Sequence, residues 1–342
     1  MEKWFPVFVP QNWIREINVF DFFSGPGEDI TGTNGSPLII LDGVEKYGKI
    51  LEDKRIIVNL RFNEFKRAKK AQLDVTLDAR KPLRKVIRLE TESLRFDQVF
   101  KQWLPEMAKS NVANLLFLDQ SGIKFASPDI FRRIIQLRVT DFIFFISSST
   151  IHRFKQHPDI VKYIDLPESD FNSSNYLHIH RLLVEFYKSL IPSDRDFHIA
   201  GFSIKKGSNI YGLVFGSGHI LGMKKFLEVA WDLDPDRGEA DFDIDEEGID
   251  RTQPSLWPEM DIPRKLMKFD QELASQILCG ELKTNNELYL YTIENGFLLK
   301  HSRNLVNRLI KEGSLPKQKI NISDEAWKKA PQPIRLKDDA HG

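Results

Sequence analysis

The sequence contains almost no cysteine. Cys279 is the single cysteine in 342 residues, which excludes an internal disulfide framework and a CxxC zinc site. The sequence has no run of about 18 apolar residues that could span a bilayer, and its first residues lack the apolar core of a signal peptide. We therefore expect a cytoplasmic protein.

The sequence also lacks a net charge. Lys and Arg total 49, as do Asp and Glu, so any basic surface for a polyanionic partner must be local. The acidic segment from Asp232 to Asp245 invites a calcium site, but an EF-hand loop needs Gly at position six and Glu at position twelve. Counted from Asp232, these positions hold Arg237 and Asp243. The segment is therefore predicted to be a solvated acidic loop, and no metal site is expected.

A distinctive turn is present near the start of the chain. The apolar run Val19–Phe23 carries an acid and leads into the turn Ser24–Gly27, where two glycines allow a tight turn and close approach of a ligand. The spacing matches neither GxGxxG nor GxxxxGK[ST]. It resembles motif I of S-adenosylmethionine (SAM) methyltransferases, especially the cytosine-C5 and related nucleic-acid enzymes. That resemblance implies a SAM site formed by Asp21, Phe23, Ser24, Gly25, Pro26 and Gly27. The alternative is a helix cap with a structural glycine turn.

The remaining pattern predicts an α/β fold. Apolar runs alternate with helix-like segments from residue 17 onward, which is typical of a mostly parallel sheet. Phe197–Lys205 and Asn209–Phe215 predict a late antiparallel hairpin, which suits the reversed edge of a Rossmann-like SAM-methyltransferase sheet. The earlier strands are predicted at 17–23, 55–62, 84–89, 114–118 and 141–146. This domain is expected to cover 1–263, with an insertion around 155–195.

Polar residues follow two further predicted strands. Asn63 and Glu64 come after the second strand, where an acid can accept both ribose hydroxyls of a nucleoside cofactor; the alternative is a charge that favours the helix N-terminus. Asp119 ends the fourth strand, the position used for catalysis in such sheets. It is the candidate catalytic residue, either orienting an amine or acting as a base, and the alternative is a turn cap. The (N/D)PP(Y/F) tetrad and the Pro-Cys nucleophile are both absent, so covalent C5 attack is not expected.

The last part of the chain, 264–342, is predicted to be a winged-helix-like α module with a tail. Helices are expected at Arg264–Leu278, Asn285–Ile293 and Leu299–Lys311, followed by a strand at Ser314–Ile320. The third helix is predicted to contact nucleic acid, with basic groups on phosphates and amides on base edges. The alternative is a protein-binding module with an ordinary solvated face. The residues proposed for nucleic acid are Lys300, Arg303, Asn304, Asn307, Arg308 and Lys311.

Five stretches, in order, resemble the three-Cys-motif partner protein family. They are DFFSGPG, NGSPLIIL, VNLRFNE, NLLFLDQSG and LVFGSGHILGMKKFLEVAW, and the final GFLLKHSRNLVNRLIKEG is similar to the family's ending. The resemblance implies a SAM-methyltransferase-like domain, a C-terminal helical module and a partner bearing three cysteines, similar to radical-SAM proteins. Where the family often has D-P-x-G, this chain has Asp119-Gln120-Ser121-Gly122, which leaves the backbone there less constrained.

Two functions therefore remain open. One is a SAM-dependent methyltransferase acting on DNA or RNA, with the target base flipped out of a duplex. The other is a non-catalytic specificity partner of a three-cysteine radical-SAM-like protein. A nuclease is disfavoured because no PD-(D/E)xK-like spacing is present.

Overall fold

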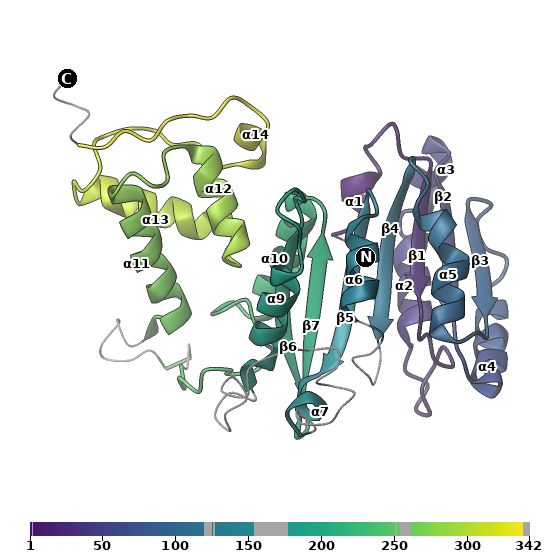
Figure 1. Ribbon diagram of the computed structural model, residues 1–342. Coiled ribbons are helices and arrows are strands. Elements are labelled where there is room, and N and C mark those ends of the chain that lie inside the picture. The colour runs from purple at the N-terminus through teal and green to yellow at the C-terminus, as the bar shows by residue number, and fades with distance from the viewer. Residues whose placement is uncertain are drawn as a thin grey trace. The chain divides into compact units, whose positions relative to one another are not determined.

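The computed structural model forms two compact units, which divide after Gly222 (Figure 1). The first unit is Met1–Gly222 and the second is Met223–Gly342. The residues that the structure describes are 1, 3–119, 125, 127–153, 177–249, 252–253 and 261–337.

A seven-stranded sheet is the centre of the first unit. The strand order is β3-β2-β1-β4-β5-β7-β6; β1 to β5 run parallel, and β7 is antiparallel to both of its neighbours. The chain runs outward from β1 in one direction and from β4 in the other, so the switch point lies between these two strands. This confirms the predicted Rossmann-like α/β sheet with a reversed hairpin edge. The strands are β1 Glu16–Asp21, β2 Ile57–Asn63, β3 Ile87–Glu92, β4 Val112–Asp119, β5 Thr140–Ser147, β6 His198–Lys206 and β7 Asn209–Ser217.

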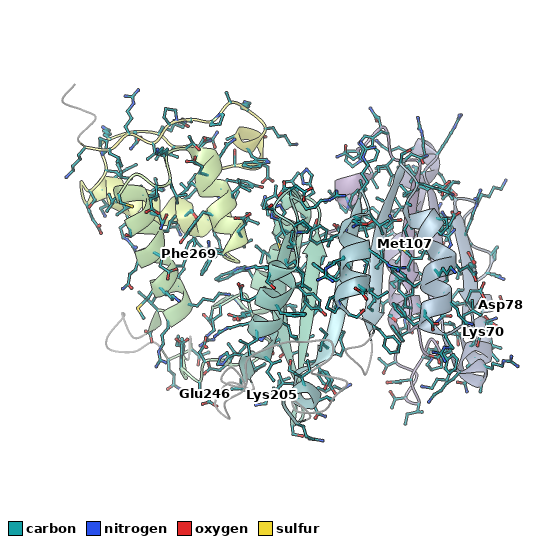
Figure 2. All side chains as sticks on the ribbon, viewed as in Figure 1. Lys70, Asp78, Met107, Lys205, Glu246 and Phe269 are labelled. Atoms are coloured by element: carbon teal, nitrogen blue, oxygen red, sulfur yellow. The ribbon has the colours of Figure 1, made fainter. Side chains whose placement is uncertain are left out.

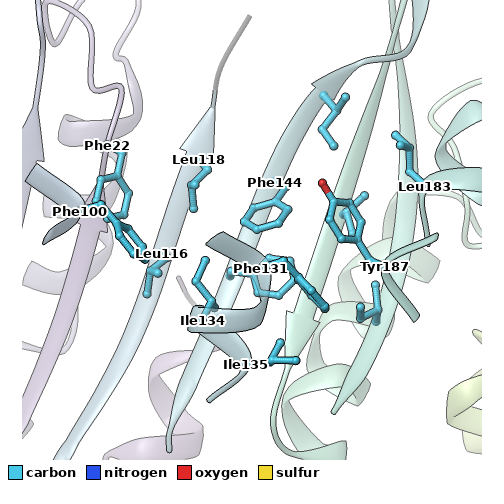
Figure 3. Packing of buried hydrophobic residues seen from close by; sticks show 14 of the residues in the cluster. Phe22, Phe100, Leu116, Leu118, Phe131, Ile134, Ile135, Phe144, Leu183 and Tyr187 are labelled. Carbon is cyan, nitrogen blue, oxygen red and sulfur yellow. The ribbon is translucent and has the colours of Figure 1, made fainter. Parts of the chain in front are cut away.

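Helices cover both faces of this sheet because side chains alternate along each strand. Ile17 and Val19 of β1 pack in one buried cluster, and Phe20 and Phe22 pack in the other. Figure 3 shows the second cluster, where Phe131 lies between strand and helix side chains. Among the described residues, no helix combines the length and apolarity needed to cross a bilayer. The helices of this unit are α1 Phe5–Phe8, α2 Ser36–Glu45, α3 Gly48–Lys54, α4 Arg67–Asp78, α5 Phe96–Met107, α6 Pro128–Ile135, α7 Ser148–Arg153 and α9 Ile179–Ser189.

A ladder of buried polar side chains crosses four parallel strands. The Asn59 amide donates to Asn18 Oδ1 (2.8 Å), the Asn18 amide to Asn114 Oδ1 (3.0 Å), and the Asn114 amide to Thr140 Oγ1 (3.0 Å). These residues are also backbone register partners. A slip of one residue would bury unpaired amides, each costing about 1–3 kcal/mol. The ladder therefore fixes the register of the sheet.

Some sequence-predicted boundaries differ from the structure. The third strand begins at Ile87 rather than at residue 84, because Arg84 is drawn to the surface by Glu45 and Glu52 (3.1 and 3.0 Å). The polar part of the predicted insertion, 159–175, lies outside the described residues.

The helices of the second unit match their predicted ranges closely. They are α11 Arg264–Leu278, α12 Asn285–Glu294, α13 Leu299–Lys311 and the short α14 Asp324–Trp327, and α10, Ile220–Leu233, spans the division between the units. The strand predicted at 314–320 was wrong, since this segment has no strand structure. The Ser314 and Leu315 amides instead bond to Leu309 O at the end of α13, and Pro316 has no N–H for a ladder. The wing is therefore missing from the described module.

The acidic segment before α11 belongs to the second unit, so this unit begins before the predicted boundary at residue 263. The buried Arg237 guanidinium bonds to Glu247 (2.7 Å) and Asp243 (2.8 Å), and Lys265 pairs with Glu239 (3.1 Å). The Asp234 carboxylate accepts four backbone N–H groups. The segment is thus an ordered ion-pair cluster rather than a solvated loop. No metal-binding group of acids, His or Cys occurs among the described residues.

A buried acid at the amino end of β5 predicts a pH dependence of stability. Asp141 accepts a hydrogen bond from Trp4 Nε1 (2.7 Å), and burial raises its pKa from 3.8 to about 6. Because the pKa is higher in the folded state, the carboxyl stabilises the fold most below about pH 4, and this contribution is lost as the pH rises through 6.

Asp141→Asn should therefore become more stable relative to wild type as the pH rises. The difference in free energy of unfolding should grow by about 2 kcal/mol between pH 4 and pH 7, measured by urea denaturation. The matched control is Asp129→Asn, at an exposed position. A difference for Asp141→Asn that does not change with pH would contradict the burial argument.

Candidate functional site

The parallel strands end at one edge of the sheet, the lower edge in Figure 1. Asp21, Asn63 and Asp119 are the last residues of β1, β2 and β4, and the register pairs Asp21 with Phe62 on one side and Phe117 on the other. In open α/β sheets, ligands bind outside the carboxyl ends of the strands at the switch point. The sequence-predicted site residues of the first unit are therefore brought together at this edge.

Asp21 holds the turn against the first long helix. It is fully buried; one carboxylate oxygen accepts from the Phe23 N–H (3.1 Å) and the other from the Ser36 hydroxyl (2.5 Å) at the start of α2. Asp21 therefore positions the turn that was predicted to bind the ligand. Ser36 was missed in the sequence, although Ser followed by Pro is a recognised signal of a helix start.

The two glycines of the turn have different roles. Both have positive φ, +66° at Gly25 and +89° at Gly27. A Cβ at Gly27 would lie 3.2 Å from Leu73 and 3.3 Å from Thr76 of α4, whereas a Cβ at Gly25 would meet nothing within 4 Å. Gly27 thus allows close packing, and Gly25 leaves the backbone of the turn open to an approaching molecule.

The rest of the turn is anchored to the sheet. The Ser24 N–H donates to Asn63 O (3.0 Å), and the Ser24 hydroxyl donates to Asp21 O (3.0 Å). The half-buried Phe23 ring stacks on Phe96, with centroids 5.6 Å apart. Pro26 is half-buried beside the open Gly25.

Asn63 is engaged within the protein. Its amide donates to Phe22 O (3.2 Å) and Leu94 O (3.1 Å), and its Oδ1 accepts from the Leu94 N–H (3.0 Å). It therefore ties the turn after β1 to the connection after β3. This positioning role differs from the ligand contact that its place in the sequence indicated.

Glu64 has the helix N-terminal role, and its contact with ribose hydroxyls stays a prediction. The half-buried carboxylate accepts from the Lys66 N–H (2.7 Å) at the start of α4, as expected of an acid near a helix N-terminus. A carboxylate has about four acceptor positions, so this bond leaves capacity for ligand hydroxyls. Glu64 lies one residue beyond the end of β2, at the same edge as the turn.

Asp119 is placed by its backbone at the end of β4. In the register, Phe117 pairs with Asp21, so Asp119 lies two residues further along at the carboxyl edge. Gln120, Ser121 and Gly122 fall outside the described residues. The catalytic role of Asp119 stays a prediction.

In the second unit, α13 presents one polar face. The six predicted residues follow the spacing i, i+3, i+4, i+7, i+8 and i+11, which places them on one side of a helix, and all six are exposed. Arg308 pairs with Asp270 of α11 (2.8 Å), and the Lys300 ammonium lies 5.8 Å from the Trp231 ring centroid. The opposite side is buried through Leu305, Val306 and Leu309.

Comparisons with known proteins give structural likenesses alone. No family model matches the chain, and no curated protein matches it. Three solved structures are similar: an O-methyltransferase of tomaymycin synthesis from Streptomyces achromogenes, in complex with SAM (11% identity, 63% of this chain and 78% of that one, TM-score 0.32); a putative methylase from Haemophilus influenzae (10%, 62% and 85%, TM-score 0.28); and a putative methyltransferase from Escherichia coli (11%, 62% and 82%, TM-score 0.27). The fold assignment rests on the strand order itself.

Removing the Asn63 amide should destabilise the first unit. Asn63→Ala leaves the part-buried Leu94 N–H and two backbone carbonyls without their partner, at a cost of about 2–4 kcal/mol. The measurement is urea unfolding, with the exposed Asn304→Ala as a control expected within about 0.5 kcal/mol of wild type. If Asn63→Ala were equally mild, Asn63 would not hold the turn.

Proposed function

We propose that this protein is a SAM-dependent methyltransferase-like protein whose cofactor binds at the turn after β1. The observation that carries the proposal is the open backbone at Gly25, held by the buried Asp21 at the carboxyl edge beside the switch point. A ligand can approach this backbone without meeting a side chain.

Each residue of the edge has a distinct role in this proposal. The backbone of Ser24–Gly27 receives the methionine end of SAM, and the acceptor capacity of Glu64 receives the ribose hydroxyls. SAM supplies a methyl group on a positively charged sulfur. A nitrogen or oxygen acceptor loses a proton when it is methylated, and Asp119 is the group proposed to orient that acceptor or take its proton.

Nucleic acid is the proposed acceptor. The exposed cations of α13 neutralise phosphates, and Asn304 and Asn307 supply amide donors and acceptors for base edges. A base in a duplex must leave its stack before its reactive atom can be reached.

The alternative is a non-catalytic partner of a three-cysteine radical-SAM-like protein. It is favoured by Gln120, which replaces the proline often found in the related D-P-x-G motif. Under this alternative the fold binds SAM, or no cofactor, and provides specificity to the partner.

The cofactor proposal is tested by calorimetric titration with SAM and S-adenosylhomocysteine. Gly25→Val should weaken binding by at least about tenfold, because a β-branched residue is strained at φ +66° and its side chain fills the open approach. Gly207→Val is a matched control in the β6–β7 turn, where φ is +61° and a Cβ also meets nothing within 4 Å. Wild type that binds neither ligand, or equal losses in both variants, would contradict the proposal.

The acceptor proposal is tested by methyl transfer from labelled SAM to bulk RNA and DNA, together with binding to the same nucleic acids. Arg303→Glu/Lys311→Glu should weaken binding and lower the salt slope by about 1 to 2. Lys328→Glu/Lys329→Glu makes the same change in charge at exposed residues off α13 and should leave binding intact. Capture of a three-cysteine protein without any methyl transfer would favour the partner alternative, and methyl transfer by the protein alone would exclude it.

A further inference from the structure

The carboxyl edge of the sheet carries a second group of exposed side chains beside the turn. We call this group the rim patch, and it consists of Ile30, Phe65, Lys66, Arg67 and Lys69. All five residues are exposed, with Phe65 at 63% and Ile30 completely open to solvent. The group includes neither the turn residues nor Glu64, and it contains no residue of α13.

Phe65 is an exposed ring on a fixed backbone. Its carbonyl accepts from the Ser93 hydroxyl (3.1 Å), and the preceding Glu64 N–H donates to Glu92 O (3.0 Å). A phenyl ring left in water keeps apolar surface exposed that burial would stabilise. An aromatic face held open beside a ligand edge is the kind of platform on which unpaired bases stack.

The three cations of the patch lack ion-pair partners among the described residues. Other cations on or just after α4 are paired: Lys70 lies 2.6 Å from Asp74, and Lys81 lies 2.7 Å from Asp78. Figure 2 labels Lys70 and Asp78 on this helix. Lys66, Arg67 and Lys69 therefore retain charge that can neutralise phosphates.

Ile30 stands at the tip of a loop with a fixed shape. The Asp29 carboxylate accepts from the Thr31 N–H (2.8 Å), the Thr31 hydroxyl (2.7 Å) and the Thr33 N–H (2.9 Å), and Glu28 forms a β-bridge with Asn34. These hydrogen bonds hold the pKa of Asp29 below its usual value. These bonds fix the backbone on both sides of Ile30, and its apolar side chain is exposed to water.

The start of α4 lies beside the turn, because the Ser24 N–H donates to Asn63 O (3.0 Å), two residues before Phe65. The loop follows the turn directly, and Gly27 at its base lies against Leu73 and Thr76 in the second half of α4. The rim patch therefore borders the turn to which we assign the cofactor, although it does not include that turn. Aromatic and aliphatic contacts combined with unpaired cations match the chemistry of a single strand, whose bases are exposed and whose phosphates are charged.

We propose that the rim patch binds single-stranded nucleic acid, with a base on Phe65, phosphates on Lys66, Arg67 and Lys69, and Ile30 against a neighbouring base. This rests on the proposed function, which it deepens by naming an unpaired strand as the form presented at the cofactor edge. Stacking on Phe65 tolerates any base, so the contact supplies affinity rather than sequence specificity.

The test is fluorescence anisotropy of the full chain with labelled oligouridylate, oligothymidylate and a duplex, each about 20 nucleotides long, at several salt concentrations. Lys66→Glu/Arg67→Glu/Lys69→Glu should weaken single-strand binding by at least about tenfold and lower the salt slope by about 2. Phe65→Ala should cost about tenfold and Phe65→Trp should retain binding. Ile30→Ser should cause a smaller loss. Comparing the affinities for oligouridylate and oligothymidylate shows whether the patch prefers single-stranded RNA or single-stranded DNA.

A matched control places the same charge change at the opposite edge. Lys49, Lys54 and Lys85 are exposed and lie before β2 and β3, so their triple change to Glu should leave single-strand binding near wild type. Equal losses in both triple variants, wild type that prefers the duplex, or wild type that binds no oligonucleotide would overturn the proposal.

Titration with SAM separates this proposal from the cofactor site. If Phe65→Ala lowered SAM affinity but not oligonucleotide affinity, Phe65 would belong to the cofactor site and the rim patch would be overturned. If Gly25→Val abolished SAM binding while rim variants alone reduced oligonucleotide binding, both proposals would be supported. If the protein bound single strands but not SAM, the rim patch would be supported and the proposed cofactor site would be contradicted.

Discussion

The amide ladder across Asn59, Asn18, Asn114 and Thr140 is the constraint on which the rest of the first unit depends. Apolar faces alone tolerate small slips between parallel strands, whereas buried amides do not, because each unpaired group costs about 1–3 kcal/mol. With the register fixed, the carboxyl ends of the strands meet at one edge. The turn, Asn63, Glu64 and the backbone of Asp119 gather there for that reason.

Buried polar groups then turn this edge into a site. Asp21 and Asn63 use their hydrogen-bonding groups within the protein, and in doing so they hold the backbone around Gly25 open. Buried polar groups have the same positioning role in the second unit, where Asp234 and Arg237 order the acidic segment. In both units the conspicuous acids serve first to position the chain.

Charge is arranged locally in a chain with no net charge. Many cations are neutralised by nearby acids, as Lys70 is by Asp74 and Arg308 is by Asp270. Cations without ion-pair partners among the described residues occur on the exposed face of α13 and on the rim patch. Each surface lies in a different compact unit, so each can be tested by its own variants.

The sequence by itself determined the alternation of strands and helices, the glycine turn, the hairpin edge and the ranges of α11 and α13, because these depend on local periodicity and on residues with special backbone freedom. It did not determine the amide ladder, since Asn114 stands at the head of an apolar run whose partners are distant in the chain. Only the tertiary structure decided that Asn63 faces inward while Phe65 stays in water, and that the segment after α13 bonds back to Leu309 instead of forming a strand. These outcomes depend on contacts between residues that are distant in the sequence, and a local sequence pattern does not predict such contacts.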